Sequence, residues 1–187
     1  MTVTRHGRPL LPALEAWSLF LSAKATDRTP ALLGTGGRIV FAAVLAGYFW
    51  RSALTKIDGF GLSSGAYVQI FPRAMEAAGY DPGRLSPWAD LVVAAGTAAE
   101  IVLPLMLILG AFTRLAALGM IGFVIVMSLT DIVGHGVDGA TIGALFDRQP
   151  DASIVDQRLL WTWLFAGLAV TGGGPLSLDR IIFRERL

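Results

Sequence analysis

The sequence has no cysteine and few charged residues, and each shortage excludes a class of protein. Without cysteine, the chain has no disulfide framework, no thiolate metal site and no redox thiol of its own. Charged residues make up only 16% of the 187 residues, whereas soluble domains carry about 25%. A water-facing surface needs those charges, so much of this surface does not face water. The formal net charge of +1 also excludes a nucleic-acid partner held by bulk electrostatics.

In place of charge the chain has hydrophobic residues, which are 54% of the total, and a mean hydropathy of +0.62. A helix needs about 20 mostly apolar residues to cross a bilayer core of about 30 Å. Four segments meet or approach this length: about Gly37–Thr55, Trp88–Leu109, Leu115–Val133 and Leu159–Thr171. The fourth segment is short, and it can be extended through Gly172–Leu178. The sequence therefore predicts an all-α, integral membrane four-helix bundle.

The N-terminal stretch Pro9–Ala23 is apolar but too short to cross the membrane. Glu15 and two prolines interrupt the apolar core that a signal peptide needs, and Ala23-Lys24-Ala25 is a poor cleavage site. We interpret this stretch as an amphipathic helix on the membrane surface. The expected division is a cytoplasmic N-terminal segment at 1–35, the transmembrane domain at 36–182 and a cytoplasmic tail at 183–187.

Lysine and arginine are distributed unevenly between the two sides of the predicted bundle. Four spans place both termini and the Gly110–Arg114 turn on one side, with nine Lys/Arg against four acids, while the other side has six against nine. The positive-inside bias then predicts cytoplasmic termini in a bacterial inner membrane. The loops at about 57–87 and 134–158 should face outward, and we expect both to contain short helices. Ile142, Leu145 and Phe146 should pack as a cap in the second loop.

Several ionisable residues lie within or beside the spans, where charge is costly and usually faces the bundle interior. At a rise of about 1.5 Å per residue, Arg51 and Glu100 differ in depth along the helix axes by about 6 Å. An arginine side chain can bridge this distance. Asp131, His135 and Arg158 should lie near the outer end. We predict a polar cluster of these five residues in the outward half of the bundle. Two interpretations remain open, a ligand site and an Arg51–Glu100 pair that only locks two helices together.

Asp131 and His135 also have the one-turn spacing of two metal ligands on a helix. The only other histidine, His6, should lie on the opposite side, so we favour a capped helix end over a metal site. Lys56 and Arg158 are typical of membrane-interface anchors. Trp50 and Trp161 suit either a headgroup belt or the wall of a pocket for a planar lipid-soluble ligand.

The motifs of self-contained catalysis are missing from the sequence. It has no glycine-rich phosphate loop, no Gly-x-Ser-x-Gly elbow and no histidine pair suited to haem. We therefore expect no catalytic activity from this chain alone.

Three stretches carry a resemblance to a known family. Phe49–Ile57 has an aromatic–small–lysine helix ending, and Ala99–Ala117 has a glutamate, a leucine-rich run, a glycine and an arginine. Asp156–Trp161, followed by Gly172–Arg180, completes the pattern. Together they resemble the DoxX family of small four-helix membrane proteins over roughly residues 36–182.

The resemblance implies an accessory membrane protein. The founding member of the family is similar to a membrane subunit of a thiosulfate:quinone oxidoreductase, and relatives with a similar Leu-Ser-Leu-Asp tail resemble components of metal-stress operons, notably copper. Carried over by position, the residues expected to matter are Arg51, Lys56, Glu100 and Arg114. We expect a platform in the lipid bilayer that docks a redox or metal-handling protein and admits a quinone between its helices. A homodimer is compatible with this expectation.

The alternative is a small transporter or metal-binding membrane protein that uses Glu100, Asp131 and His135. A proton or cation path needs polar groups at successive depths, and these residues supply some of them.

Overall fold

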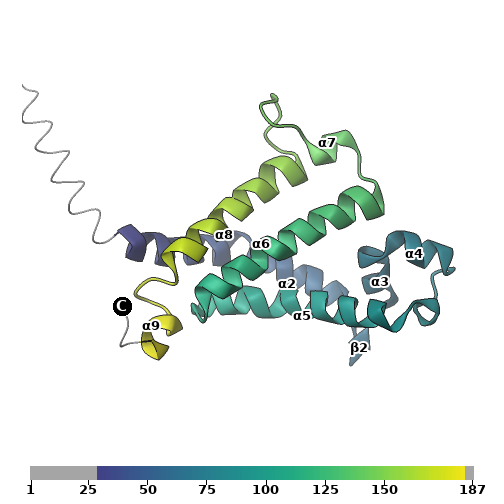
Figure 1. Cartoon of the computed structure of the whole chain (residues 1–187), viewed down its shortest axis with the longest axis horizontal. Helices are drawn as coiled ribbons and strands as arrows, with labels where there is room; N and C mark the ends of the chain where they lie inside the picture. Colours follow the sequence, from purple (N-terminus) through teal and green to yellow (C-terminus); the bar gives the residue numbers. More distant parts are fainter. Residues whose placement is uncertain (1–28, 184–187) are drawn as a thin grey trace, which may run out of the picture.

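The structure, a computed structural model, describes residues 29–183 and is almost entirely helical (Figure 1). Within this part of the chain the only strands form a two-stranded antiparallel hairpin, β1–β2. The elements are, in order, the helix Thr29–Val44, α2 (Ala46–Thr55), β1 (Ile57–Asp58), β2 (Gly61–Leu62), α3 (Ser64–Ile70), α4 (Pro72–Ala77), the 3₁₀ turn η1 (Pro82–Arg84), α5 (Pro87–Leu109), α6 (Thr113–Leu129), the π-helical turn η2 (Thr130–His135), α7 (Gly139–Ile142), the π-helical turn η3 (Ser153–Arg158), α8 (Leu159–Thr171) and α9 (Leu178–Ile182).

The second and third predicted spans are confirmed as membrane-length helices. Helix α5 has 23 residues and ends at Gly110, whose left-handed φ of 67° suits glycine. Helix α6 continues through η2, so Thr113–His135 is also 23 residues long. Both are long and apolar enough to cross a membrane. Pro104 lies inside α5 without ending it, as membrane helices tolerate.

The first predicted span is longer than expected and bent. Its helix begins at Thr29 rather than Gly37, and its two parts, Thr29–Val44 and α2, meet at an angle of 44°. Counted as one span, this pair would be a third membrane-crossing helix.

The fourth predicted span matches α8 residue for residue, from Leu159 to Thr171. Its predicted extension through Gly172–Leu178 is wrong, because Gly172 has a φ of 75° and the chain leaves the helix there. The added helical length lies instead on the N-terminal side, in η3. Helix α8 has only 13 residues, so its passage across the bilayer remains a prediction.

Helix α6 packs between α5 and α8, and α2 packs against α5 (Figure 1). These helices pack around an apolar core. Its largest side chains are fully buried, among them Phe41, Phe49, Leu107, Met120 and Phe165. The predicted small helices in the two loops are present as α3, α4 and α7. They lie at one end of the molecule, which we call the loop end, whereas the start of the first helix and α9 lie at the opposite, terminal end (Figure 1).

The first loop packs on the helices, whereas part of the second does not. Ala66, Tyr67 and Met75 form a small core with Val93 of α5, and the Tyr67 hydroxyl donates a 2.7 Å hydrogen bond to Asp90. That bond, with burial, raises the pKa of Tyr67 above its usual value.

In the second loop, Leu145 and Phe146 are largely exposed, so the predicted cap is wrong at these residues. Phe146 has a φ of 64°, a tight-turn conformation that points it out of the fold.

The Arg38 side chain ties the terminal end together. Arg38 is buried and donates to four carbonyl oxygens, those of Leu107, Ile108, Gly173 and Leu176, at 2.5–2.8 Å. These acceptors lie at the end of α5 and in the loop after α8. Arg38 thus satisfies carbonyl groups that the end of α5 leaves without helical partners.

The predicted N-terminal amphipathic helix lies outside the described residues, as does most of the predicted tail at 183–187. Residues 29–35, which the predicted division placed in the N-terminal segment, belong to the first helix.

Candidate functional site

The most buried charged residues near the loop end are Lys56 and Glu100. The Lys56 Nζ atom donates to the two carboxylate oxygens of Glu100 at 2.8 and 3.0 Å. Each residue is only 4% exposed. Ser52, one turn before Lys56, accepts from Nζ at 2.8 Å and donates to Glu100 at 3.1 Å. The pair therefore has a fully hydrogen-bonded setting, which a buried charge requires.

A second ion pair joins α6 to the start of α8. The Arg158 guanidinium donates to Asp131 at 2.5 Å and to the Ser128 hydroxyl at 3.1 Å. Arg158 is 8% exposed, and its acceptors lie on α6 and on the π-helical turn that follows. Both residues of this pair belong to π-helical turns, a geometry often found at functional sites.

Both ion pairs line one cavity of about 220 Å³, which we call the polar cavity. Its walls come from α2, α3, α5, α6, η2 and Arg158. The polar lining residues are Tyr48, Ser52, Lys56, Gln69, Glu100, Thr130, Asp131, His135 and Arg158. The remaining lining is apolar: Ile70, Val92, Gly96, Phe123, Val126 and Met127. The polar cavity thus has hydrogen-bonding groups from five elements facing an aliphatic and aromatic wall.

Four of the five residues of the predicted polar cluster, Glu100, Asp131, His135 and Arg158, meet at this cavity. The predicted Arg51–Glu100 pair is wrong, because Lys56 occupies that position and Arg51 is exposed. The reason is helix rotation: Ser52 and Lys56 are one turn apart on one face, whereas Arg51 is turned about 100° from Ser52. Depth alone could not distinguish the two cations.

The structure gives His135 and Asp131 partners other than a metal. The His135 Nε2 atom lies 2.9 Å from the Gln69 carbonyl oxygen, a position in which it donates a hydrogen bond. Asp131 is engaged by Arg158. Among residues 29–183, no group of three His, Asp or Glu side chains is placed to hold a metal ion.

The two tryptophans chosen as pocket walls do not line the polar cavity. Trp50 donates to the Ile101 carbonyl oxygen at 3.3 Å, and Trp161 contacts the rings of Tyr48 and Phe49 at centroid distances of 5.3 and 6.0 Å. Tyr48 is the aromatic residue of α2 that reaches the cavity, with Phe123 of α6 beside it. Trp161 therefore supports the wall from behind.

Sequence reasoning missed four polar lining residues: Tyr48, Ser52, Gln69 and Thr130. Tyr48, Ser52 and Lys56 recur every four residues, and on α5 the lining residues Val92, Gly96 and Glu100 do the same. This spacing places side chains on one helix face. A polar stripe of this kind on an otherwise apolar helix is the signal that would have identified Tyr48 and Ser52.

Comparison with known proteins identifies the family of the chain. The family model described as DoxX matches residues 37–132, about half of the chain. The matched region contains Lys56, Glu100 and Asp131 and ends before His135 and Arg158. No curated protein and no solved structure matches the chain.

Proposed function

The chain belongs to the DoxX family of membrane proteins, and from this premise we propose that it is an accessory membrane subunit whose polar cavity binds the headgroup of a lipid-soluble quinone. The observation that carries the proposal is the meeting of two ion pairs, Lys56–Glu100 and Arg158–Asp131, in one cavity with an apolar wall. A ligand pocket of this kind combines mostly apolar lining with a few placed polar groups.

The donors that a quinone carbonyl needs are present in the cavity. Arg158 has five N–H groups, and its bonds to Ser128 and Asp131 use two of them. The Tyr48 hydroxyl lies beside Arg158, and within residues 29–183 the acceptor for its proton is the Met127 sulfur, at 3.8 Å. Because sulfur is a weak acceptor, the hydroxyl proton is available to a stronger one. Phe123 and the Met127 side chain offer contacts suited to a flat ring.

The cavity also has a side that a lipid-soluble molecule could approach. Three of its lining residues, Tyr48, Val92 and Val126, are 44–60% exposed on the outer surface of the helices. That surface is apolar and consistent with contact with lipid tails. Ligand exchange by this route would not require passage through water.

A bound quinone would supply reversible two-electron, two-proton chemistry. The chain has no cysteine and no catalytic motif of its own, so we assign the electron donor's chemistry to a partner protein. The loop end is the surface that we assign to that partner, since it carries fully exposed Phe60 at the hairpin tip and Phe146 in the second loop. The role of this chain would be to hold and orient the quinone.

The alternative, a proton or cation path, has less support. From the polar cavity toward the terminal end, the space between the helices is filled by the apolar core that contains Phe41, Met120 and Phe165. A path needs polar groups at successive depths. The apolar core favours a closed binding site.

The experiment measures quinone retained by the full chain after gentle extraction from bacterial membranes, with mass spectrometry of the bound lipids. In the Lys56→Met/Glu100→Leu variant, apolar groups replace the buried pair, a change that often preserves stability. We expect this variant and Arg158→Gln to lose quinone, whereas Arg51→Gln, which changes an exposed cation on the same helix, retains it. If the wild-type chain carries no quinone and does not bind an added short-chain benzoquinone, the proposal is wrong.

A further inference from the structure

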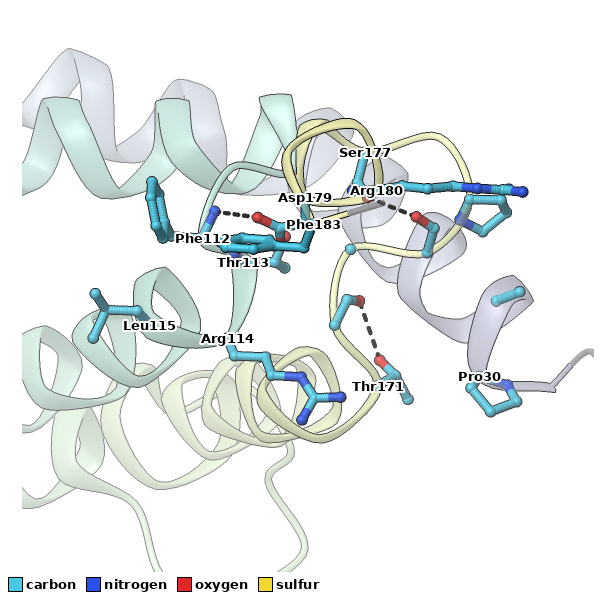
Figure 2. A pocket seen from close by; sticks show the side chains of 15 residues that line it. Pro30, Phe112, Thr113, Arg114, Leu115, Thr171, Ser177, Asp179, Arg180 and Phe183 are labelled. Carbon is cyan, nitrogen blue, oxygen red and sulfur yellow. Dashed lines mark hydrogen bonds between the residues drawn. The ribbon is translucent and has the colours of Figure 1, made fainter. Parts of the chain in front are cut away.

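A second and larger cavity, of about 870 Å³, lies at the terminal end, and we call it the terminal cavity. Its walls are the first turn of α6, the glycine loop after α8, α9 and the start of the first helix (Figure 2). It shares no lining residue with the polar cavity. An inference about it is therefore independent of the proposed quinone site.

The terminal cavity has more positive than negative charge. Arg114 and Arg180 line it and are exposed, and within residues 29–183 neither guanidinium has an ion pair or hydrogen bond. Figure 2 shows the Arg114 side chain extending from α6 toward the loop that follows Thr171. The single acid of the lining, Asp179, uses one oxygen each to accept the backbone N–H groups of Phe112 and Thr113. Arg114 and Arg180 therefore extend from different walls of the terminal cavity, and its one carboxylate is already engaged.

Unpaired hydrogen-bond donors share one wall of this cavity. The Thr113 hydroxyl is completely buried and has no partner. The backbone N–H groups of Gly173 and Gly174 donate to no acceptor in the described chain. Buried polar groups without partners are rare in folded proteins, and each calls for an explanation. Successive free backbone N–H groups beside cationic side chains are a recurrent setting for phosphate oxygens.

The glycine at position 173 is required by the close packing of this wall. A Cβ atom there would lie 2.6 Å from both the Thr113 hydroxyl oxygen and the Ser177 Cβ. Any side chain at this position would push the loop away from α6. The loop, the hydroxyl and Arg114 thus remain together only with glycine at 173.

The rim of the terminal cavity is apolar. Phe112, Leu115 and Phe183 line it and are 43–66% exposed. The cavity lies where α5 ends and α6 begins, so in a bilayer it would be at the level of the headgroups. Basic pockets between membrane helices at this level are suited to anionic lipid headgroups. A free inorganic anion would make no use of the apolar rim.

We propose that the terminal cavity binds one anionic phospholipid, with the phosphodiester held by Arg114 and the Gly173–Gly174 backbone and the acyl chains lying along Leu115 on the outside of α6. Arg180 contributes positive charge from the opposite wall. Arginine suits this role because its planar guanidinium can give two parallel hydrogen bonds to one phosphate. The site is defined by charge, free donors and an apolar rim in one cavity.

The experiment measures binding of phosphatidylglycerol to the purified full chain in detergent by native mass spectrometry, beside phosphatidylcholine of the same acyl chains. We expect a preference for phosphatidylglycerol that falls about tenfold or more in the Arg114→Gln/Arg180→Gln variant. The matched control is Arg73→Gln/Arg148→Gln, which removes two exposed arginines of the loop end. The control should bind phosphatidylglycerol as the wild type does.

A second variant separates lipid binding from folding. Thr113→Val removes the unpaired hydroxyl at nearly constant volume, so the lipid-free protein should be at least as stable as the wild type. Its affinity for phosphatidylglycerol should equal that of the wild type, because the buried hydroxyl has no accessible surface for the lipid to contact. Equal binding of the two lipids, equal loss in both double variants, or displacement of the lipid by millimolar inorganic phosphate alone would overturn the proposal.

Discussion

At the scale of single residues, two cations at the end of α2 that are similar in the sequence differ in their burial. Lys56 is buried against Glu100, whereas Arg51 is exposed. The two positions are five residues apart, which turns their side chains by about 140° around the helix. The buried lysine therefore depends on its partner, and the exposed arginine does not.

We expect Lys56→Gln to lower the free energy of unfolding by about 3–5 kcal/mol, because it leaves the Glu100 carboxylate buried without a cation. Arg51→Gln should change it by no more than about 0.5 kcal/mol, as is usual for an exposed position. Thermal unfolding of the purified variants in detergent measures both. Equal destabilisation by the two substitutions would contradict the assigned pairing.

At the scale of elements, the start of α6 is completed by a residue far away in the sequence. Phe112 precedes α6 with a left-handed φ of 47° and provides no side-chain cap. The Asp179 carboxylate supplies one from the tail, accepting the backbone N–H groups of Phe112 and Thr113. The Asp179 N–H in turn donates to the Gly110 carbonyl oxygen at 2.8 Å. The Leu-Ser-Leu-Asp tail thus serves as the N-cap of α6.

Replacement of this cap should loosen the turn between α5 and α6. We expect Asp179→Ala to cost about 1 kcal/mol, the usual value for loss of an N-cap, and to speed hydrogen exchange at the amides of Phe112 and Thr113. Asp58→Ala, which removes an exposed aspartate of the hairpin, is the matched control. Unchanged exchange at these two amides would show that another group caps α6.

At the scale of the whole molecule, the charge distribution and the fold agree on two ends of different character. The terminal end carries the arginines at positions 38, 114 and 180, and the loop end carries the polar cavity and most of the acids. The positive-inside bias predicts that the terminal end is cytoplasmic. This orientation requires α8 and η3 together to cross the bilayer.

The absence of native cysteine makes this prediction simple to test. Phe146→Cys and Phe183→Cys place single thiols before and after α8, both at exposed positions. We expect a membrane-impermeant maleimide added to spheroplasts to label Phe146→Cys at once and Phe183→Cys only after the membrane is disrupted. Labelling of both variants from the same side would mean that α8 does not cross.

Much of the candidate site was predictable, for a physical reason. Glu100, Asp131 and Arg158 are charged residues in or beside apolar helices, and such groups must find partners inside the fold. Two errors have the same cause: Arg51 instead of Lys56 was expected as the partner of Glu100, and Tyr48 and Ser52 were not expected in the site. The prediction used depth along the helices and ignored rotation around them.

The sequence by itself determined that this is an all-α membrane protein with long apolar helices at α5 and α6 and a shorter one at α8. The length of an apolar run is a local property, and the boundaries of α8 followed from it residue for residue. Only the tertiary structure decided the bend in the first helix, the Lys56–Glu100 pairing and the return of Asp179 to α6. These features depend on how helices rotate and pack against residues distant in the chain, which no local pattern encodes.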